Sequence, residues 1–105
     1  MGYQGGFLTQ NLSGLTVGSL TLDPTFDEDV TSYTVDTDDA TNTVSATAEN
    51  EDATVEILLN GVSQESGTGS VSKSLTWTTN TDIVMVKVTY NSSSKVYYIT
   101  VTHEG

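Results

Sequence analysis

Acidic side chains gather in three short runs whose composition suits a calcium-binding loop. The runs are Asp27-Glu28-Asp29, Asp36-Thr37-Asp38-Asp39 and Glu49-Asn50-Glu51-Asp52. Ca²⁺ takes about six to eight oxygen ligands, so such runs are candidates for a metal site. None of them has the glycine at the sixth position and the glutamate at the twelfth that an EF-hand loop requires. We therefore interpret these acids as solvated loop charge, and we predict no metal ligand and no cofactor.

Few other residues are of the types that catalysis needs. His103 is the single histidine and stands close to the end of the sequence, where we expect no pocket to orient it. Cysteine and arginine are absent. Gly67-Thr68-Gly69-Ser70 resembles a phosphate-binding loop, but it lacks the lysine and no helical pattern follows it, so we predict a hairpin loop. The sequence thus predicts no catalytic residue and no enzymatic activity.

Two aromatic residues are candidates for stacking against a sugar ring. Trp77 shares its parity with Val71 and Leu75, which places it in the core. Tyr98 has the opposite parity to Tyr97 and is expected to face outward. A single exposed tyrosine is ordinary on a protein surface. Together with a threonine-rich face, however, it leaves carbohydrate binding as an alternative function.

Charge and length limit the possible partners and classes. The chain has 105 residues, enough for one domain, and a formal net charge of -11 from 3 lysines and 14 acidic residues. Such a chain cannot neutralise a phosphate backbone, and anionic lipid repels it, so we predict no nucleic-acid partner and no membrane insertion. The start of the sequence has neither the basic nor the apolar segment of a signal peptide.

Apolar residues alternate with polar ones in run after run, which is the pattern of half-buried β-strands. Asn60-Gly61 predicts a type I′ turn, and Asn91-Ser92-Ser93-Ser94 a second turn. No apolar stripe has helical spacing. The sequence predicts an all-β, antiparallel sandwich of about seven main strands with short extras, and the expected runs are 12–17, 20–22, 31–37, 43–49, 54–59, 62–65, 70–77, 83–90 and 96–102.

The order of these residues resembles the bacterial cadherin-like β-sandwich domain, a branch of the immunoglobulin-like superfold. The likeness covers residues 12–103. It lies in a leucine-rich start, a proline–phenylalanine–tyrosine block and two closing strands: Leu12-Ser13-Gly14-Leu15-Thr16-Val17, Leu22-Asp23-Pro24-Thr25-Phe26-Asp27, Val30-Thr31-Ser32-Tyr33-Thr34-Val35, Val84-Met85-Val86-Lys87-Val88-Thr89 and Tyr97-Tyr98-Ile99-Thr100-Val101-Thr102. We expect a flexible lead-in or linker over residues 1–10 and the cadherin-like domain over 11–105.

The resemblance implies a non-catalytic structural or interaction module, acting as a spacer, adhesion or decoration domain. It implies a bacterial cell-surface or secreted protein, or a phage virion, with neighbouring domains, assembly subunits or a cell-surface glycan as partners. Within the block, Pro24 forces a break in the chain and Phe26 is expected to plug one end of the sandwich. Tyr33 shares parity with Val35, so its ring should face the core and its hydroxyl should find a backbone partner, as in a tyrosine corner.

Overall fold

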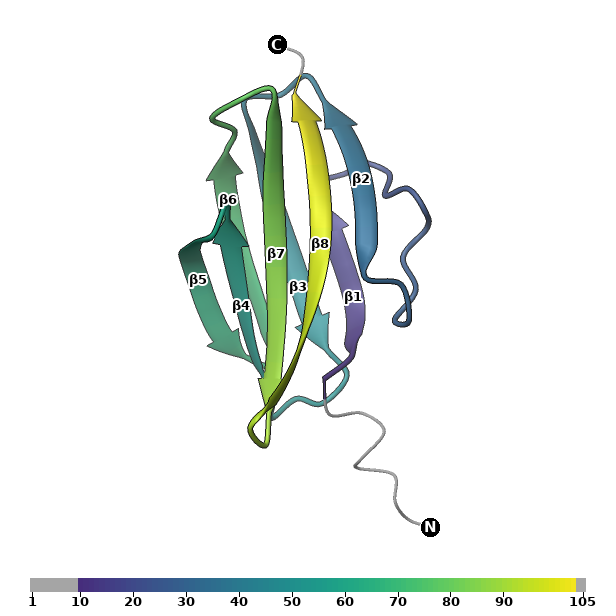
Figure 1. Ribbon diagram of the computed structural model, residues 1–105, viewed down its shortest axis with the longest axis vertical. Helices are drawn as coiled ribbons and strands as arrows, with labels where there is room; N and C mark the ends of the chain where they lie inside the picture. The colour runs from purple at the N-terminus through teal and green to yellow at the C-terminus, as the bar shows by residue number, and fades with distance from the viewer. Residues whose placement is uncertain (1–9, 104–105) are drawn as a thin grey trace.

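Eight β-strands and no helix make up residues 10–103, the part of the chain that the computed structural model describes (Figure 1). No helix in this part is long and apolar enough to cross a membrane. The strands are β1 (Leu12–Val17), β2 (Ser32–Thr37), β3 (Thr41–Ala48), β4 (Thr54–Leu59), β5 (Val62–Thr68), β6 (Ser70–Thr76), β7 (Thr81–Tyr90) and β8 (Ser93–His103).

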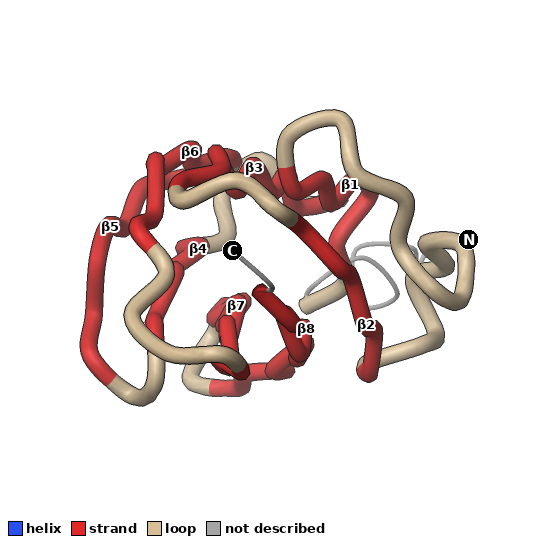
Figure 2. Tube along the Cα trace, turned by 90° about the horizontal axis from the view of Figure 1, so that it is seen from above, coloured by secondary structure: helices blue, strands red, loops and turns tan. Residues whose placement is uncertain are grey.

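The strands form two facing sheets, which Figure 2 shows end-on. One sheet has the order β1-β3-β6, and the other has the order β2-β8-β7-β4-β5. All neighbours are antiparallel except β2 and β8, which run parallel from Ser32 opposite Tyr98 to Thr37 opposite His103. The predicted sandwich is confirmed, with this one parallel pair that period-two patterning did not reveal.

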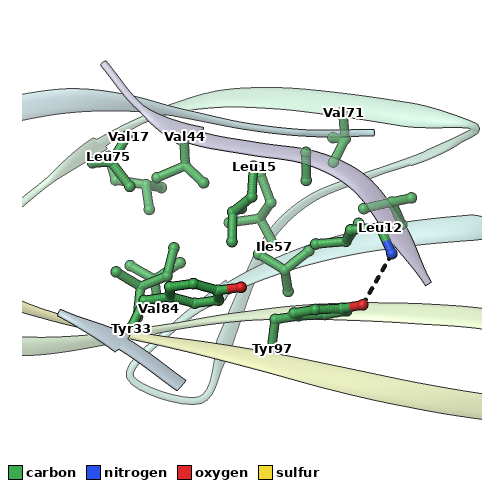
Figure 3. Packing of buried hydrophobic residues seen from close by; sticks show 14 of the residues in the cluster. Leu12, Leu15, Val17, Tyr33, Val44, Ile57, Val71, Leu75, Val84 and Tyr97 are labelled. Carbon is green, nitrogen blue, oxygen red and sulfur yellow. Dashed lines mark hydrogen bonds between the residues drawn. The ribbon is translucent and has the colours of Figure 1, made fainter. Parts of the chain in front are cut away.

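The core lies between the sheets and is built from the inward parity of each strand. Val44, Ala46 and Ala48 of β3 are buried, as are Val84, Val86 and Val88 of β7. Burial of apolar surface is the main stabilising contribution of such a layer. The inward parity also includes two aromatic side chains with almost no exposed surface, Tyr33 and Tyr97, which Figure 3 shows packed among the aliphatic residues of the core.

Two tight turns lie where the sequence predicts them. Asn60 and Gly61 both have positive φ, at 52° and 89°, and join β4 to β5. Asn91 and Ser92 also have positive φ, at 56° and 71°, and join β7 to β8. A type I′ turn needs positive φ at both central positions. Glycine adopts positive φ more readily than serine, so Asn60-Gly61 predicts such a turn more strongly than Asn91-Ser92 does.

Two local predictions are wrong. Residues 20–22 form no strand; Leu20 and Leu22 do pack on the core, but only Asp23 makes an isolated bridge, to Thr34. The segment 67–70 is not a hairpin loop, because Gly67 and Thr68 belong to β5 and Ser70 begins β6 in the opposite sheet. Gly69 makes this corner with φ 84°, and an added Cβ would lie 3.0 Å from the Glu51 carbonyl oxygen.

The segment between β1 and β2, residues 18–31, carries the chain from one sheet to the other, and we call it the crossover. Leu22 is buried within it, and the ring of Phe26 lies 6.0 Å from that of Tyr33 and 6.5 Å from that of Tyr97, measured between centroids. The crossover places β2 beside β8, at the edge of the five-stranded sheet, where the two strands run in the same direction.

Candidate functional site

Two of the three acidic runs lie in connections between strands, and the third, Asp36-Thr37-Asp38-Asp39, begins in the last two residues of β2. Asp27-Glu28-Asp29 is in the crossover, and the Asp27 carboxylate accepts a hydrogen bond from the Asp29 amide at 2.8 Å. Glu49-Asn50-Glu51-Asp52 joins β3 to β4, where the Asn50 side-chain oxygen accepts from the Asp52 amide at 2.9 Å. In residues 10–103, no three histidine, cysteine or acidic side chains are close enough to hold a metal ion. The polar groups of these runs therefore order their own loops.

A hollow of about 390 Å³ lies beside the remaining acidic run. Its lining is Leu20 and the four residues from Asp36 to Asp39. Thr37 and Asp39 are tied to one another there, since the Asp39 amide donates to the Thr37 hydroxyl at 3.0 Å. This lining has three carboxylates and the Thr37 hydroxyl, but that hydroxyl donates to the Asn42 side-chain oxygen at 3.0 Å and not to a carboxylate, so the hollow holds no nucleophile paired with a base.

His103 is the last residue of β8 and lies opposite Thr37 of β2. Its amide donates to the Asn80 carbonyl at 2.8 Å, so its backbone is part of the sandwich and not a frayed end. Gly67 to Ser70 form the corner between the sheets. The backbones of His103 and of the corner from Gly67 to Ser70 are thus part of the sandwich.

One of the two candidate aromatics is buried and the other is exposed. Trp77 is buried, and its indole N–H donates to the Asn42 side-chain oxygen at 2.9 Å. Tyr98 is 44% exposed on the outer face of the five-stranded sheet, opposite Met85 of β7 and Ser32 of β2. The predicted orientations of both rings are confirmed.

Two buried tyrosine hydroxyls hold the crossover, an arrangement that we call the crossover tie. The Tyr33 hydroxyl donates to the Asp27 carbonyl at 2.7 Å and accepts from the Asp27 amide at 3.0 Å. The Tyr97 hydroxyl donates to the Glu28 carbonyl at 2.8 Å and accepts from the Leu12 amide at 3.0 Å, the contact dashed in Figure 3. The backbone partner predicted for the Tyr33 hydroxyl is confirmed. The sequence analysis did not predict the hydrogen bonds of the Tyr97 hydroxyl.

Burial raises the pKa of the Tyr33 phenol, and the hydrogen bond with the Asp27 backbone only partly offsets this effect. Tyr33 therefore remains a neutral phenol, able to donate and accept at once. The parity of Tyr97 with Ile99 and Val101 was a usable signal, because an inward tyrosine requires a hydrogen-bond partner. Its partners, 69 and 85 residues away in sequence, left no local trace.

Lys95 reinforces the same region from the start of β8. Its ammonium donates to the Asn11 side-chain oxygen at 2.8 Å and to the Glu28 carbonyl at 2.9 Å, and it lies 5.1 Å from the centre of the Tyr97 ring. A hydrogen bond with Glu49 raises the pKa of the Glu28 carboxyl, desolvation and nearby acids add to this effect, and Lys95 opposes it. The lysine thus joins the chain before β1, the crossover and β8.

Asp82 is a buried carboxylate that the sequence analysis did not identify. It is fully buried and accepts hydrogen bonds from the Asn60 amide group at 2.8 Å, from the Thr78 amide and hydroxyl, and from the Thr79 amide and hydroxyl. Burial raises the pKa of this carboxyl, but the hydrogen bonds from Asn60, Thr78 and Thr79 outweigh it, and the net pKa lies below its ordinary value. Asp82 has the same parity as the buried Val84, and this pattern could have predicted that its side chain faces the core.

The Asp82 carboxylate links two connections by hydrogen bonds. Asn60 lies in the β4–β5 turn, and Thr78 and Thr79 lie in the connection before β7. Both carboxylate oxygens of Asp82 accept hydrogen bonds from the side chain or backbone of these connections. A buried and fully paired charge of this kind is a structural element.

Two packed sheets, a parallel β2–β8 pair and a buried tyrosine that holds the preceding connection define an immunoglobulin-like β-sandwich domain. Within that class, the chain belongs to the cadherin-like beta sandwich domain family, whose model matches residues 12–104. No curated protein and no solved structure matched the chain in the same comparisons.

Replacing Tyr97 with phenylalanine should lower the free energy of unfolding by about 1–3 kcal/mol, because the buried Leu12 amide loses its partner and the Glu28 carbonyl keeps only the hydrogen bond from Lys95. Urea unfolding followed by tryptophan fluorescence measures the change. Tyr98→Phe is the matched control, since it removes a hydroxyl from an exposed ring, and it should change stability by less than about 0.5 kcal/mol. Equal effects of the two substitutions would argue against the crossover tie.

Replacing Asp82 with asparagine should destabilise the domain at pH 7 by about 1–3 kcal/mol, because the amide cannot accept from all five donors. The folded pKa of Asp82 is depressed, so its contribution is present above the unfolded pKa and is lost as pH falls through the folded pKa. The stability gap between the wild type and D82N should therefore close below about pH 4.

Urea unfolding at a series of pH values tests this dependence on Asp82. Asp38→Asn, at an exposed position, is the control and should leave stability at pH 7 nearly unchanged. A gap between the wild type and D82N that stayed constant into acid would show that ionisation of Asp82 does not stabilise the fold.

Proposed function

We propose that this domain is a non-catalytic structural and interaction module, a spacer in a bacterial surface or secreted protein or in a phage virion. The proposal rests chiefly on where the chain enters and leaves the sandwich. Gln10 donates to the Tyr90 carbonyl beside the β7–β8 turn, at one end of the strands. His103 leaves β8 at the opposite end, as Figure 1 shows. Successive domains attached to such a module would be held apart by its full length.

The interior and the family support the same proposal. The inward side chains fill the space between the sheets, and the buried polar atoms of the described residues all have hydrogen-bond partners. Membership in the cadherin-like family supports an extracellular setting and protein partners. The net charge of -11 favours solubility and disfavours self-association, which suits a module that keeps its neighbours apart.

Joining two copies of the chain head to tail tests the spacer function. The 11 residues of β8 span about 35 Å at about 3.3 Å per residue, so the second copy should raise the maximum dimension by at least that length. Small-angle X-ray scattering of the single and joined chains measures it. A joined chain no longer than the single one, with the copies folded side by side, would refute the spacer proposal.

Carbohydrate binding is the second candidate, and the exposed ring of Tyr98 is the observation that favours it. A flat aromatic ring can stack against the apolar face of a sugar. NMR titration with a panel of oligosaccharides, repeated on Y98A, separates the two functions. A pure spacer should show no saturable shift changes, whereas saturable changes around Tyr98 that disappear in Y98A would establish the glycan function.

A further inference from the structure

We infer that Asn60-Gly61 is a site of spontaneous deamidation, which the folded domain protects through hydrogen bonds between the Asn60 side chain and the start of β7. The turn that contains the pair is exposed, whereas both polar atoms of the asparagine side chain are hydrogen-bonded. The inference does not depend on the spacer function, because it concerns the covalent lifetime of the chain. It gives the Asp82 network a chemical role in addition to its contribution to stability.

In an Asn-Gly pair, the asparagine side chain is open to attack by the next backbone nitrogen, because glycine has no side chain to hinder the approach. The Gly61 N–H gives its proton to a solvent base, and its nitrogen attacks Cγ of Asn60. A bond between that nitrogen and Cγ forms, the bond from Cγ to the side-chain nitrogen breaks, and this nitrogen takes a proton and leaves as ammonia. Water then opens the cyclic imide at either of its carbonyls, which leaves aspartate or isoaspartate at position 60.

The start of β7 holds the reacting carbon in place. The Asn60 side-chain nitrogen donates to the Asp82 carboxylate at 2.8 Å, and the side-chain oxygen accepts from the Ile83 amide at 2.9 Å. The Asn60 backbone amide also donates to the Ile83 carbonyl at 2.8 Å. Attack by Gly61 makes Cγ tetrahedral and moves both of its polar atoms, so it must break the two side-chain hydrogen bonds. The reaction therefore requires a local opening of the turn, and its rate follows the population of the open form.

The product does not fit the contacts of the reactant. Aspartate at position 60 replaces a donor with an acceptor, and it brings two carboxylates together where the amide now lies 2.8 Å from Asp82. Asp82 is buried, so salt screens this repulsion only weakly. Isoaspartate adds a methylene group to the backbone of a turn in which Asn60 and Gly61 both have positive φ. Either product lowers the stability of the fold, so each conversion makes further opening easier.

The β7–β8 turn supplies an internal reference. Asn91-Ser92 is likewise exposed and has positive φ at both residues, but it follows the other end of β7 from Asp82, out of reach of that carboxylate. Serine hinders its own backbone nitrogen more than glycine does, so the unfolded chain should convert Asn60 faster than Asn91. The folded domain should invert this order, because Asp82 and Ile83 hold Asn60 and not Asn91.

Peptide mapping by mass spectrometry, after incubation in mildly alkaline buffer with and without urea, measures both rates in the wild type. Asn60 should convert at least about tenfold more slowly in the folded domain than in urea, and more slowly there than Asn91. A folded-state rate for Asn60 equal to its rate in urea would overturn the inference, as would an Asn60 that converts faster than Asn91 in the folded domain.

Two variants separate the Asp82 contact from overall stability. D82N replaces the carboxylate with a weaker acceptor and should raise the Asn60 rate about fivefold in native buffer. Y97F removes contacts with Leu12 and Glu28 instead, so it should leave the Asn60 rate within about twofold of the wild type despite a similar loss of stability. Equal acceleration in both variants would overturn the inference, because protection would then come from global stability alone.

The product itself provides a test that does not require D82N to fold. N60D should lower the folding equilibrium constant at least about tenfold, because it sets a second carboxylate against Asp82. N91D makes the same exchange at another turn position with positive φ and should change this constant by less than about threefold. Adding D82N to N60D should restore part of the loss, since an amide at position 82 can donate to a carboxylate at position 60. An N60D chain as stable as N91D would contradict the inference.

Discussion

The structure depends on two phenol groups that are buried between the sheets and still need hydrogen-bond partners. Tyr33 and Tyr97 face inward because they share parity with the aliphatic core, and their hydroxyls reach the backbone at Asp27, Glu28 and Leu12. Leaving a buried hydroxyl unpaired costs about 1–3 kcal/mol. The crossover tie therefore fixes the one long connection of the fold, and this connection places β1 in one sheet and β2 in the other.

The same constraint supports the proposed spacer function. With the crossover held against the core, β2 completes the five-stranded sheet beside β8, and the space between the sheets is filled. The acidic runs of the crossover and of the β3–β4 connection order their own loops, and the buried Asp82 carboxylate accepts hydrogen bonds on both of its oxygens. What remains for function is the outer surface, with Tyr98 upon it, and two ends that lie far apart along the strands.

Patterns among residues close in sequence predicted the features that depend on neighbouring residues. Alternation located the main strands, Asn60-Gly61 gave its turn, and the parity of Tyr33 predicted a backbone-bonded hydroxyl. The parallel β2–β8 pair and the contact from Tyr97 to Leu12 join residues remote in sequence, which alternation cannot register. Leu20 and Leu22 alternate like a strand but lie in the crossover, where no neighbouring strand offers a ladder. The expected lead-in over 1–10 lies, apart from Gln10, outside the described residues, so this boundary stays a prediction.

Hydrogen exchange of the Leu12 and Asp27 amides tests the crossover tie most directly, because each donates to a tyrosine hydroxyl and not to another strand. The account predicts that both amide protons, followed by NMR, exchange far more slowly than in an unstructured peptide, with Leu12 approaching the protection of the central strands. Exchange of both amides at unprotected rates, while β7 and β8 stay protected, would contradict it and leave the crossover without its anchor.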